Sequence, residues 1–268
     1  MSLLWVTDVD YDARGRTYGD EDRWLVSRLA DAFEIVTCHP SRARALMDDH
    51  DLVVVRNCGP VAGFADDWAA FRDHAIATGA RVYNELSGRG DMLGKAHLVE
   101  LHRAGWPVIP SAFGDTALAD LPAASSYVVK ALRGADSHGM SFRTRSELDG
   151  LDGDVVVQPR LELVAELSFV FVDGEFSYAL TTGSGERWEL EELRPDPADV
   201  ERARSFVEWN AITHGIQRVD FGRTIDGTLL LMELEDLNPY LSLDRLAAGT
   251  RDRFVAAFTR ALERALEA

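Results

Sequence analysis

The chain has 268 residues, of which 46% are hydrophobic and 27% are charged, values that are ordinary for a globular protein. Its 28 Lys and Arg residues against 45 Asp and Glu residues give a net charge of −17, and such an acidic surface repels phosphate backbones, so we expect no nucleic-acid partner. The two cysteines show no metal-ligand spacing, the N-terminus lacks the basic segment of a signal peptide, and no apolar run reaches the roughly 18 residues of a membrane helix. We therefore expect a cytoplasmic protein without a membrane partner.

Short apolar runs alternate with helical patterns in the first third of the chain. The continuous apolar run within residues 51–56 is typical of a strand that is buried on both faces. Alternating strands and helices predict a parallel sheet covered by helices, and we assign residues 1–90 to this N-terminal α/β lobe. The predicted strands are residues 3–7, 34–38, 51–56 and 80–83, and the predicted helices are residues 22–33 and 66–78.

The remaining residues predict an α+β core with two lobes, residues 91–160 and residues 161–268. Asp-Gly pairs at 173–174 and 226–227, each between apolar strands, are strong signals for two-residue hairpin turns. The last helix has an apolar residue at every fourth position, which is typical of a face turned to a core. The predicted elements are helix 91–104, strands 126–132 and 154–159, hairpins 167–180 and 217–235, and helix 251–266.

The second hairpin places charged residues on one face. Counting outward from a two-residue turn pairs Phe221 with Met232, Asp220 with Glu233, and Arg218 with Glu235. Side chains alternate along a strand, so the charged residues share a face, and the residues expected on the core face are Val219, Phe221, Met232 and Leu234. Carboxylates that face each other destabilise a hairpin, and a Mg²⁺ ion bound between them removes that cost. A solvated face, partly neutralised by Arg218, is the alternative.

Two lysines carry weaker signals. Lys130 ends a predicted strand and is followed by a small, Gly-containing loop, residues 133–140, whose backbone N–H groups could lie over phosphates. The spacing fits neither the P-loop nor the Rossmann pattern, and an ordinary surface turn is the alternative. Lys95 falls in the first turn of the helix predicted at 91–104, where most lysines are solvated.

Six segments follow one another in chain order: Lys95 with Leu98, Leu101, Gly105, Pro107 and Ser111, then Val128-Val129-Lys130, residues 155–159, Glu166-Leu167-Ser168, Arg218-Val219-Asp220, and residues 232–239. Taken together, they resemble the ATP-grasp superfamily, over residues 84–245. Within it, they look closest to the small-molecule branch that contains the D-cycloserine-forming ligase. The resemblance implies an N-terminal α/β lobe followed by two β-rich lobes that grip a nucleotide.

The resemblance also implies a function. It implies a ligase that joins a small-molecule carboxylate to an amine through an acyl phosphate, uses ATP and Mg²⁺, and releases ADP and phosphate. The implied nucleotide-binding residues are Lys95, Lys130, Gly134, Ser137, His138, Gly139, Met140, Gln158, Pro159, Arg160, Leu161 and Glu166. The implied metal ligands are Asp220, Glu233 and Glu235, and Arg218 is implied to be catalytic, neutralising charge on the transferring phosphoryl group. The candidates for substrate binding are Arg56, Asn238, Tyr240 and Ser242; Arg56 could instead pair with a surface acid, and Tyr240 could simply pack.

The sequence departs from the branch pattern mainly on the substrate side. Ala165 replaces a Gly, Asn57-Cys58-Gly59 stands where Trp-Asp-Tyr is expected, the strand at Tyr178 lacks His and Lys, and Asn238-Pro239 replaces Glu-Pro. The two substrates therefore stay unidentified, and two alternatives stay open: a catalytically impaired nucleotide-binding module, or an α+β scaffold with a solvated acidic face. Ligases of this kind are often dimers, so a homodimer is one candidate for the oligomeric state.

Overall fold

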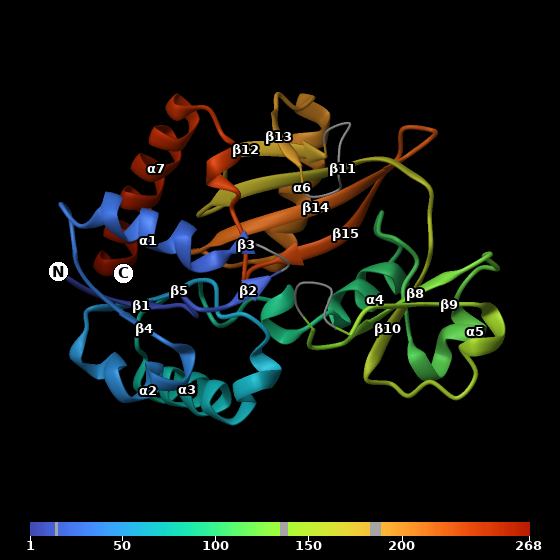
Figure 1. The fold of residues 1–268 in the computed structure, drawn as a ribbon, viewed down its shortest axis with the longest axis horizontal. Helices are drawn as coiled ribbons and strands as arrows, with labels where there is room; N and C mark the ends of the chain where they lie inside the picture. The colour runs from blue at the N-terminus through green and yellow to red at the C-terminus, as the bar shows by residue number, and fades with distance from the viewer. Residues whose placement is uncertain (14–15, 135–138, 183–188) are drawn as a thin grey trace.

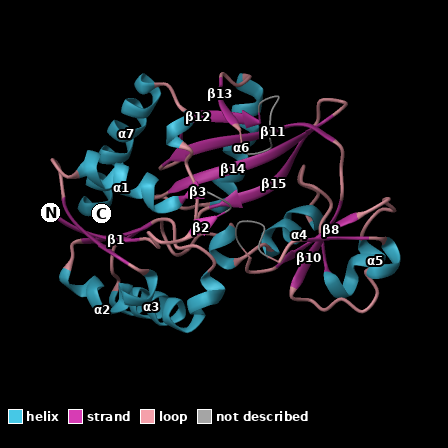
Figure 2. Ribbon diagram, viewed as in Figure 1, coloured by secondary structure: helices cyan, strands magenta, loops and turns pink. Residues whose placement is uncertain are grey.

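The computed structural model of the chain describes residues 1–13, 16–134, 139–182 and 189–268. In that part of the chain, the strands form three sheets and one short two-stranded pair (Figures 1 and 2). The strands are β1 (Ser2–Val6), β2 (Asp12–Ala13), β3 (Arg16–Thr17), β4 (Glu34–Cys38), β5 (Leu52–Val55), β6 (Val82–Tyr83), β7 (Ala112–Phe113), β8 (Tyr127–Ala131), β9 (Ser141–Arg143), β10 (Val155–Pro159), β11 (Leu163–Val172), β12 (Glu175–Thr182), β13 (Leu190–Leu193), β14 (Ile216–Thr224) and β15 (Leu229–Glu235). The α-helices are α1 (Tyr18–Leu29), α2 (Ala43–Leu46), α3 (Ala65–Thr78), α4 (Ala96–Arg103), α5 (Ala117–Asp120), α6 (Pro197–Asn210) and α7 (Ala248–Glu267).

The N-terminal sheet is parallel, as the alternation of strands and helices predicts. Its strand order is β4-β1-β5-β6, and all four residues of the inner strand β5 are buried. Val53 and Val55 pack with Phe71 of α3, whereas Leu3 and Trp5 of β1 pack on the other side with α1 and α7. Helices therefore cover both faces of this sheet (Figure 1).

Two antiparallel sheets follow, a small one of order β7-β10-β8-β9 and a large one of order β13-β12-β11-β14-β15. One face of the large sheet buries Val219 and Phe221 against Phe206 of α6 and Leu98 of α4. The opposite face packs at one end against α7, where Ile216 of β14 lies in the same cluster as the helix. Further along β14, that opposite face carries Arg218 and Asp220, which are half-buried.

The two predicted hairpins form, but only one has the predicted turn. Asp173 and Gly174 have φ angles of 48° and 79°, and Val172 pairs with Glu175, so this turn has two residues as expected. The second loop is one residue longer, because Thr224 pairs with Thr228 through an N···O distance of 3.0 Å.

The register of the second hairpin then shifts between Asp220 and Phe221. Phe221 pairs with Leu231, so the prediction that Met232 faces Phe221 in the core is wrong. Leu231 is fully buried in that position, and Met232 is half-buried at a β-bulge. The extra residue of the bulge cancels the longer turn, so that Asp220 pairs with Glu233 and Arg218 with Glu235, as predicted.

The helix predicted at 91–104 is divided in two. Residues 91–93 form a 3₁₀ turn, Gly94 follows with a φ of 91°, and α4 begins at Ala96. Lys95 is thus the residue that caps α4 and does not lie in its first turn. Among the helices of the described residues, none is long and apolar enough to cross a membrane.

Candidate functional site

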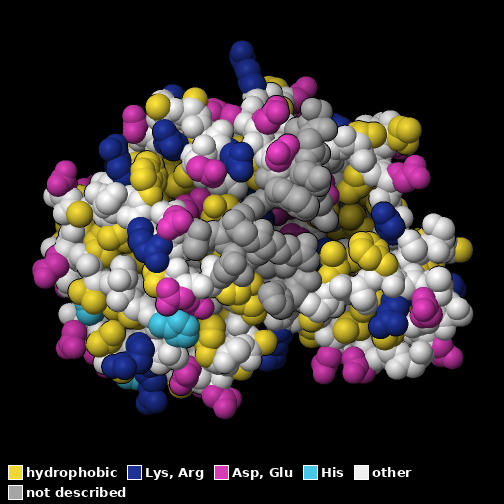
Figure 3. Space-filling model, viewed as in Figure 1, with side chains coloured by type: hydrophobic (Ala, Val, Ile, Leu, Met, Phe, Trp, Pro, Cys, Tyr) yellow, Lys and Arg dark blue, Asp and Glu magenta, His cyan; other side chains and the backbone are white. Residues whose placement is uncertain are grey.

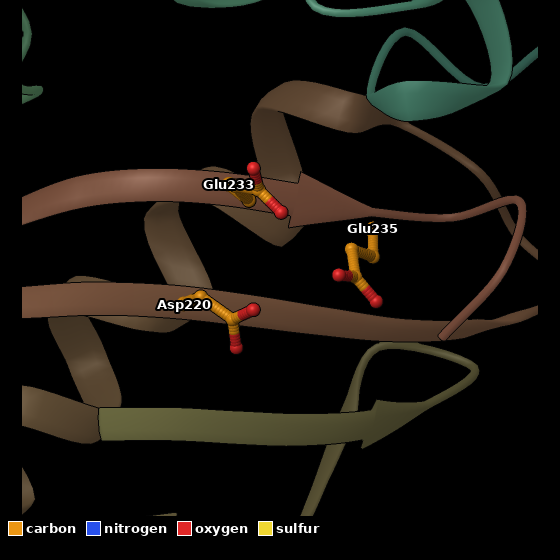
Figure 4. Close-up of side chains that lie close together, drawn as sticks. All are labelled: Asp220, Glu233 and Glu235. Carbon is orange, nitrogen blue, oxygen red and sulfur yellow. The ribbon is translucent and has the colours of Figure 1, made fainter. Parts of the chain in front are cut away.

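Three carboxyl groups gather on the open face of β14 and β15. Asp220 projects from β14, and Glu233 and Glu235 project from β15. Each offers an oxygen that lies within 4.8 Å of the others, and all three residues are half-buried. Figure 4 shows the three side chains on the same side of the two strands. The register set by the bulge at Met232 is what brings them together.

Two lysines from other parts of the chain reach this cluster. The Nζ atom of Lys95, at the start of α4, lies 3.1 Å from Glu233 Oε1, and the Nζ atom of Lys130, on β8, lies 3.3 Å from the same oxygen. The position of Lys95 is fixed by its backbone N–H, which donates to the Leu132 carbonyl at 2.8 Å. Burial opposes ionisation of Glu233, but the two ammonium groups overcome it and hold the pKa of this carboxyl well below its usual range.

Those two residues are the only lysines in the sequence; every other cation among the 28 Lys and Arg residues is Arg. A lysine ammonium is a compact point charge on a flexible stem, whereas a guanidinium is a planar fork. A chain that otherwise uses Arg throughout therefore places its two point charges on a single carboxylate. This contrast in residue usage is visible in the sequence and points to the same two positions.

Arg218 neutralises the other side of the cluster. Its Nη2 atom lies 2.8 Å from Asp220 Oδ2 and 2.6 Å from Glu235 Oε1, and its Nη1 donates to the Tyr240 carbonyl at 2.5 Å. Burial raises the pKa of Glu235 well above its usual range, although Arg218 acts in the opposite direction. Lys95, Lys130 and Arg218 thus all lie against the three carboxyl groups.

The donor set fits a hard divalent cation. Mg²⁺ prefers oxygen ligands and is usually held by one or two carboxylates together with phosphate oxygens. The triad supplies such carboxylates on a single face, and the two lysines lie beside it, where they could turn to phosphate oxygens. Figure 3 shows that the surface is hollowed between the large sheet and the part of the chain around α4 and β8, beside the residues drawn in grey.

The other predicted nucleotide residues lie at the two ends of the loop after β8, at the end of β10, and on β11. Gly134 N–H donates to the Ala131 carbonyl at 3.2 Å, Gly139 is exposed with a φ of 72°, and Met140 is half-buried. Ser137 and His138 lie outside the described residues, so the loop that was predicted to cover phosphates is seen only at its two ends.

The predicted adenine segment leaves the small sheet at the end of β10. The side chain of Gln158 is buried and donates to Ser111 Oγ at 2.9 Å, so it belongs to the interior. Pro159 is buried as well, and the N–H of Arg160 donates to the Ser126 carbonyl at 2.9 Å. Leu161 and, on β11, Glu166 are half-buried.

The four candidates for substrate binding lie where the end of β5 meets residues 238–243. Arg56 is fully buried; its Nη1 donates to the Pro239 carbonyl at 3.2 Å, and its Nη2 lies 3.5 Å from Glu21. Ser242 is 2% exposed. Asn238 accepts from Cys58 N at 2.8 Å and donates to the Gly59 carbonyl at 3.0 Å.

Of these four candidates, Tyr240 contacts the charged cluster, through Arg218. Its ring lies edge-on to Tyr18, with centroids 4.5 Å apart, and its carbonyl is the one that accepts from Arg218. Arg56 pairs with the buried acids Glu21 and Asp22, so the alternative of a surface acid is wrong, whereas the ring of Tyr240 does pack, against Tyr18.

Sequence reasoning overlooked a buried acid near these residues. Glu21, in the first turn of α1, accepts hydrogen bonds from the N–H groups of Leu241 at 2.9 Å and Leu243 at 3.1 Å. Burial raises its pKa to about 7, although Arg56 acts in the opposite direction. The helix was predicted to start at Asp22, which left Glu21 outside it; the acidic run of residues 20–22 was the available signal.

The order of the sheets matches that of known structures: the chain has the fold of the ATP-grasp ligases. The D-cycloserine synthetase DcsG superposes on it with a TM-score of 0.76 at 21% identity, over 98% of this chain and 100% of that chain. A D-alanine–D-alanine ligase from Bacillus anthracis in complex with ATP gives 0.63 at 16% identity, over 100% and 96%. The ATP-grasp ligase PsnB, in complex with a variant of its minimal precursor, Mg and ADP, gives 0.61 at 14% identity, over 98% of both chains. No family model matches the sequence, and no curated protein matches it significantly.

Proposed function

We propose that this protein is an ATP-dependent, Mg²⁺-requiring ligase that joins a small-molecule carboxylate to an amine through an acyl phosphate. One observation carries the proposal: the only two lysines of the chain meet on one oxygen of a three-carboxylate cluster. A metal-nucleotide complex needs both halves of this arrangement, acids for the cation and ammonium groups for the phosphates.

The proposed role of each residue follows from its place in the site. Lys95 and Lys130 would turn from Glu233 to phosphate oxygens, and Asp220, Glu233 and Glu235 would hold Mg²⁺. When bound, the ion would neutralise phosphate charge and orient the γ-phosphoryl group. The ends of the loop at Gly134, Gly139 and Met140 would border the phosphates, backbone groups at 158–161 would bind the adenine, and Glu166 would accept from the ribose.

The chemistry needs positioning more than reactive side chains. An oxygen of the substrate carboxylate attacks the γ-phosphorus, and the bond to the β-phosphate oxygen breaks, which gives an acyl phosphate and ADP. The amine then attacks the acyl carbon, loses a proton, and phosphate leaves. Arg218 would stabilise the negative charge on the transferring phosphoryl group, since guanidinium binds such oxygens through paired N–H groups. Because phosphoryl transfer is mainly positioning and electrostatics, no nucleophilic residue is required.

The similar structures support the general type of reaction that we propose. The similar structures are named as a synthetase and as ligases, one bound to ATP and one bound to Mg and ADP. At 14–21% identity they share the fold, and the activity of this chain rests on its own residues.

A nucleotide-binding module without turnover is the second candidate, and β12 favours it. Tyr178 of β12 is buried, and its hydroxyl donates to the Leu241 carbonyl at 2.7 Å, while Leu180 lies in the same apolar cluster. This part of β12 therefore adds no acid or base to the substrate side.

A screen of ADP release separates the two candidates. Wild-type protein is incubated with ATP, Mg²⁺ and pairs of amino acids and amines, with the Asp220→Asn variant as a blank. Release that requires both an acid and an amine and is absent from the variant supports the ligase. Binding of ATP and Mg²⁺ without release in the presence of any pair supports the module.

A further inference from the structure

The side chains of Asp91 and Asp236 each accept hydrogen bonds from backbone N–H groups at or next to the other residue. Asp91 Oδ1 accepts from the N–H groups of Asp236 and Leu237, both at 2.7 Å. In return, Asp236 Oδ1 accepts from Met92 N at 2.7 Å, and Asp236 Oδ2 accepts from Gly90 N at 3.0 Å. These four hydrogen bonds join residues 90–92 to residues 236–237, and we call the pair Asp91 and Asp236 the aspartate clasp.

The clasp joins two segments that carry site residues. Asp236 directly follows Glu235 and lies three residues after Glu233. Asp91 begins the 3₁₀ turn that ends at Leu93, and Gly94 and Lys95 follow it directly. Lys95 and Glu233 are 3.1 Å apart, so the clasp fixes both ends of that ion pair at the backbone.

The backbone of residues 88–90 packs closely against Asp236. Asp236 is completely buried, and a third donor, Asn210 Nδ2, lies 2.9 Å from its Oδ2. A Cβ atom on Gly88 would lie 2.2 Å from that oxygen, and one on Gly90 would lie 2.7 Å from the Leu234 carbonyl. A buried carboxylate is tolerated only when its acceptors are filled, and here each oxygen receives at least one N–H group.

We propose that Asp91 and Asp236 are positioning residues that set how strongly the site binds Mg²⁺ together with ATP. They touch neither ligand; they hold the start of α4 and the end of β15 at a fixed separation, so that Lys95 and the carboxylates face the same ligands. This inference rests on the proposed nucleotide site. Groups that orient metal ligands typically contribute about 10- to 100-fold to metal affinity.

The test uses substitutions that remove or keep single acceptors. Asp236→Asn leaves one oxygen where two accept, and Asp91→Ala removes the acceptor of two N–H groups. Asp91→Asn keeps Oδ1, the oxygen that accepts both, and is the matched conservative variant. Asp173→Asn is the control, because Asp173 also accepts partly buried hydrogen bonds, from Tyr83 at 2.9 Å and Gly215 at 3.1 Å, at the turn of the other hairpin.

The measurement is the calorimetric affinity for AMPPNP over a series of Mg²⁺ concentrations, with the full-length chain. We expect the Mg²⁺ concentration for half-maximal binding to rise by at least about tenfold in Asp236→Asn and Asp91→Ala. We expect Asp91→Asn and the control to stay within about twofold of wild type, whatever their thermal stability. A purely structural role would lower stability and leave the Mg²⁺ requirement unchanged.

The results separate a failure of the proposed function from a failure of the proposal on the aspartate clasp. Wild-type protein that does not bind AMPPNP with Mg²⁺ refutes the proposed function itself. Wild-type protein that binds it, with an unchanged Mg²⁺ requirement in Asp91→Ala, overturns the clasp alone. If Asp236→Asn does not fold, the pair Asp91→Ala and Asp91→Asn decides, since their comparison isolates one acceptor.

Discussion

Lys130 Nζ and Glu233 Oε1 lie 3.3 Å apart, although one residue belongs to the small sheet and the other to the edge strand of the large sheet. The contact is an ion pair between two sheets, on an oxygen that the proposed Mg²⁺ site would use. Lys95 shares that oxygen, so under the proposed function both lysines and the carboxylate would exchange partners on binding of a nucleotide.

Mg²⁺ alone should therefore bind weakly. Each carboxylate of the triad already has a cation within 3.3 Å, and the ion would have to displace a cation without phosphate oxygens to receive it. We expect titration calorimetry to show no saturable Mg²⁺ binding without nucleotide, and clear binding once ATP is present. Tight binding of Mg²⁺ to the nucleotide-free protein would show that the lysines are not competing for the triad.

Lys130→Ala should weaken ATP binding. A hydrogen bond to a charged group contributes about 1.5–3 kcal/mol, which corresponds to about 10- to 100-fold in affinity. Lys130→Arg should not restore it, because the planar guanidinium does not replace a compact ammonium at a site shared with Lys95. Calorimetry with ATP and Mg²⁺ checks both variants, and an unchanged affinity of Lys130→Ala would remove Lys130 from the phosphate site.

Asp220→Asn and Glu233→Gln should each abolish turnover while the protein stays folded. Each substitution removes a proposed metal ligand, and we expect ADP release to fall on the order of 10²-fold or more. Asp199→Asn is the control, since Asp199 forms an ion pair with Arg223 of the same hairpin at 2.5 Å and lies outside the triad. Full activity of either site variant, or equal loss in the control, would contradict the metal assignment.

Glu21 predicts a pH dependence of stability. Its pKa rises on folding from 4.5 to about 7, so between these values the folded chain holds a proton that the unfolded chain has released. Stability from this group is therefore complete below pH 4.5 and is lost as the pH rises through about 7, by up to about 3 kcal/mol. Urea unfolding at about pH 5 and about pH 8 should show a larger loss in wild type than in Glu21→Gln. Equal losses would mean that Glu21 titrates normally.

Local patterns predicted most of the fold. The apolar run at β5 and the alternation around it indicated a buried parallel strand, and Asp173-Gly174 indicated a two-residue turn; both are confirmed. Helix α6 was not predicted, although Asp196 and Pro197 form a recognisable helix start, in which the Asp196 side chain accepts from Ala198 N at 2.9 Å.

The carboxylate triad was predicted through two errors that cancel. A turn one residue longer than expected shifts the pairing of Phe221, and the bulge at Met232 shifts it back before Asp220. No local signal in the sequence marks that bulge. Counting from a two-residue turn therefore gave the correct pairing of Asp220 with Glu233 only because the bulge cancels the longer turn.

Contacts between distant segments could not be predicted from periodicity. Asp91 and Asp236 are separated by 145 residues, and nothing in either segment indicates the other. Arg56 illustrates the same limit: a charged residue after a strand suggests an exposed site, but its partners Glu21 and Pro239 lie far away in sequence and enclose it. The usage of Lys and Arg over the whole chain was a signal for Lys95 and Lys130 that the sequence interpretation did not use.

Thermal unfolding with ATP, in the presence and absence of Mg²⁺, tests the central claim most directly when wild type is compared with Glu233→Gln. The account predicts that ATP with Mg²⁺ stabilises wild type, by about 2.7 kcal/mol at a hundredfold excess over Kd, and that the effect shrinks without Mg²⁺ and in the variant. If ATP has no effect on wild type in either condition, the site does not bind a nucleotide, and the three carboxylates with their three cations are a structural cluster.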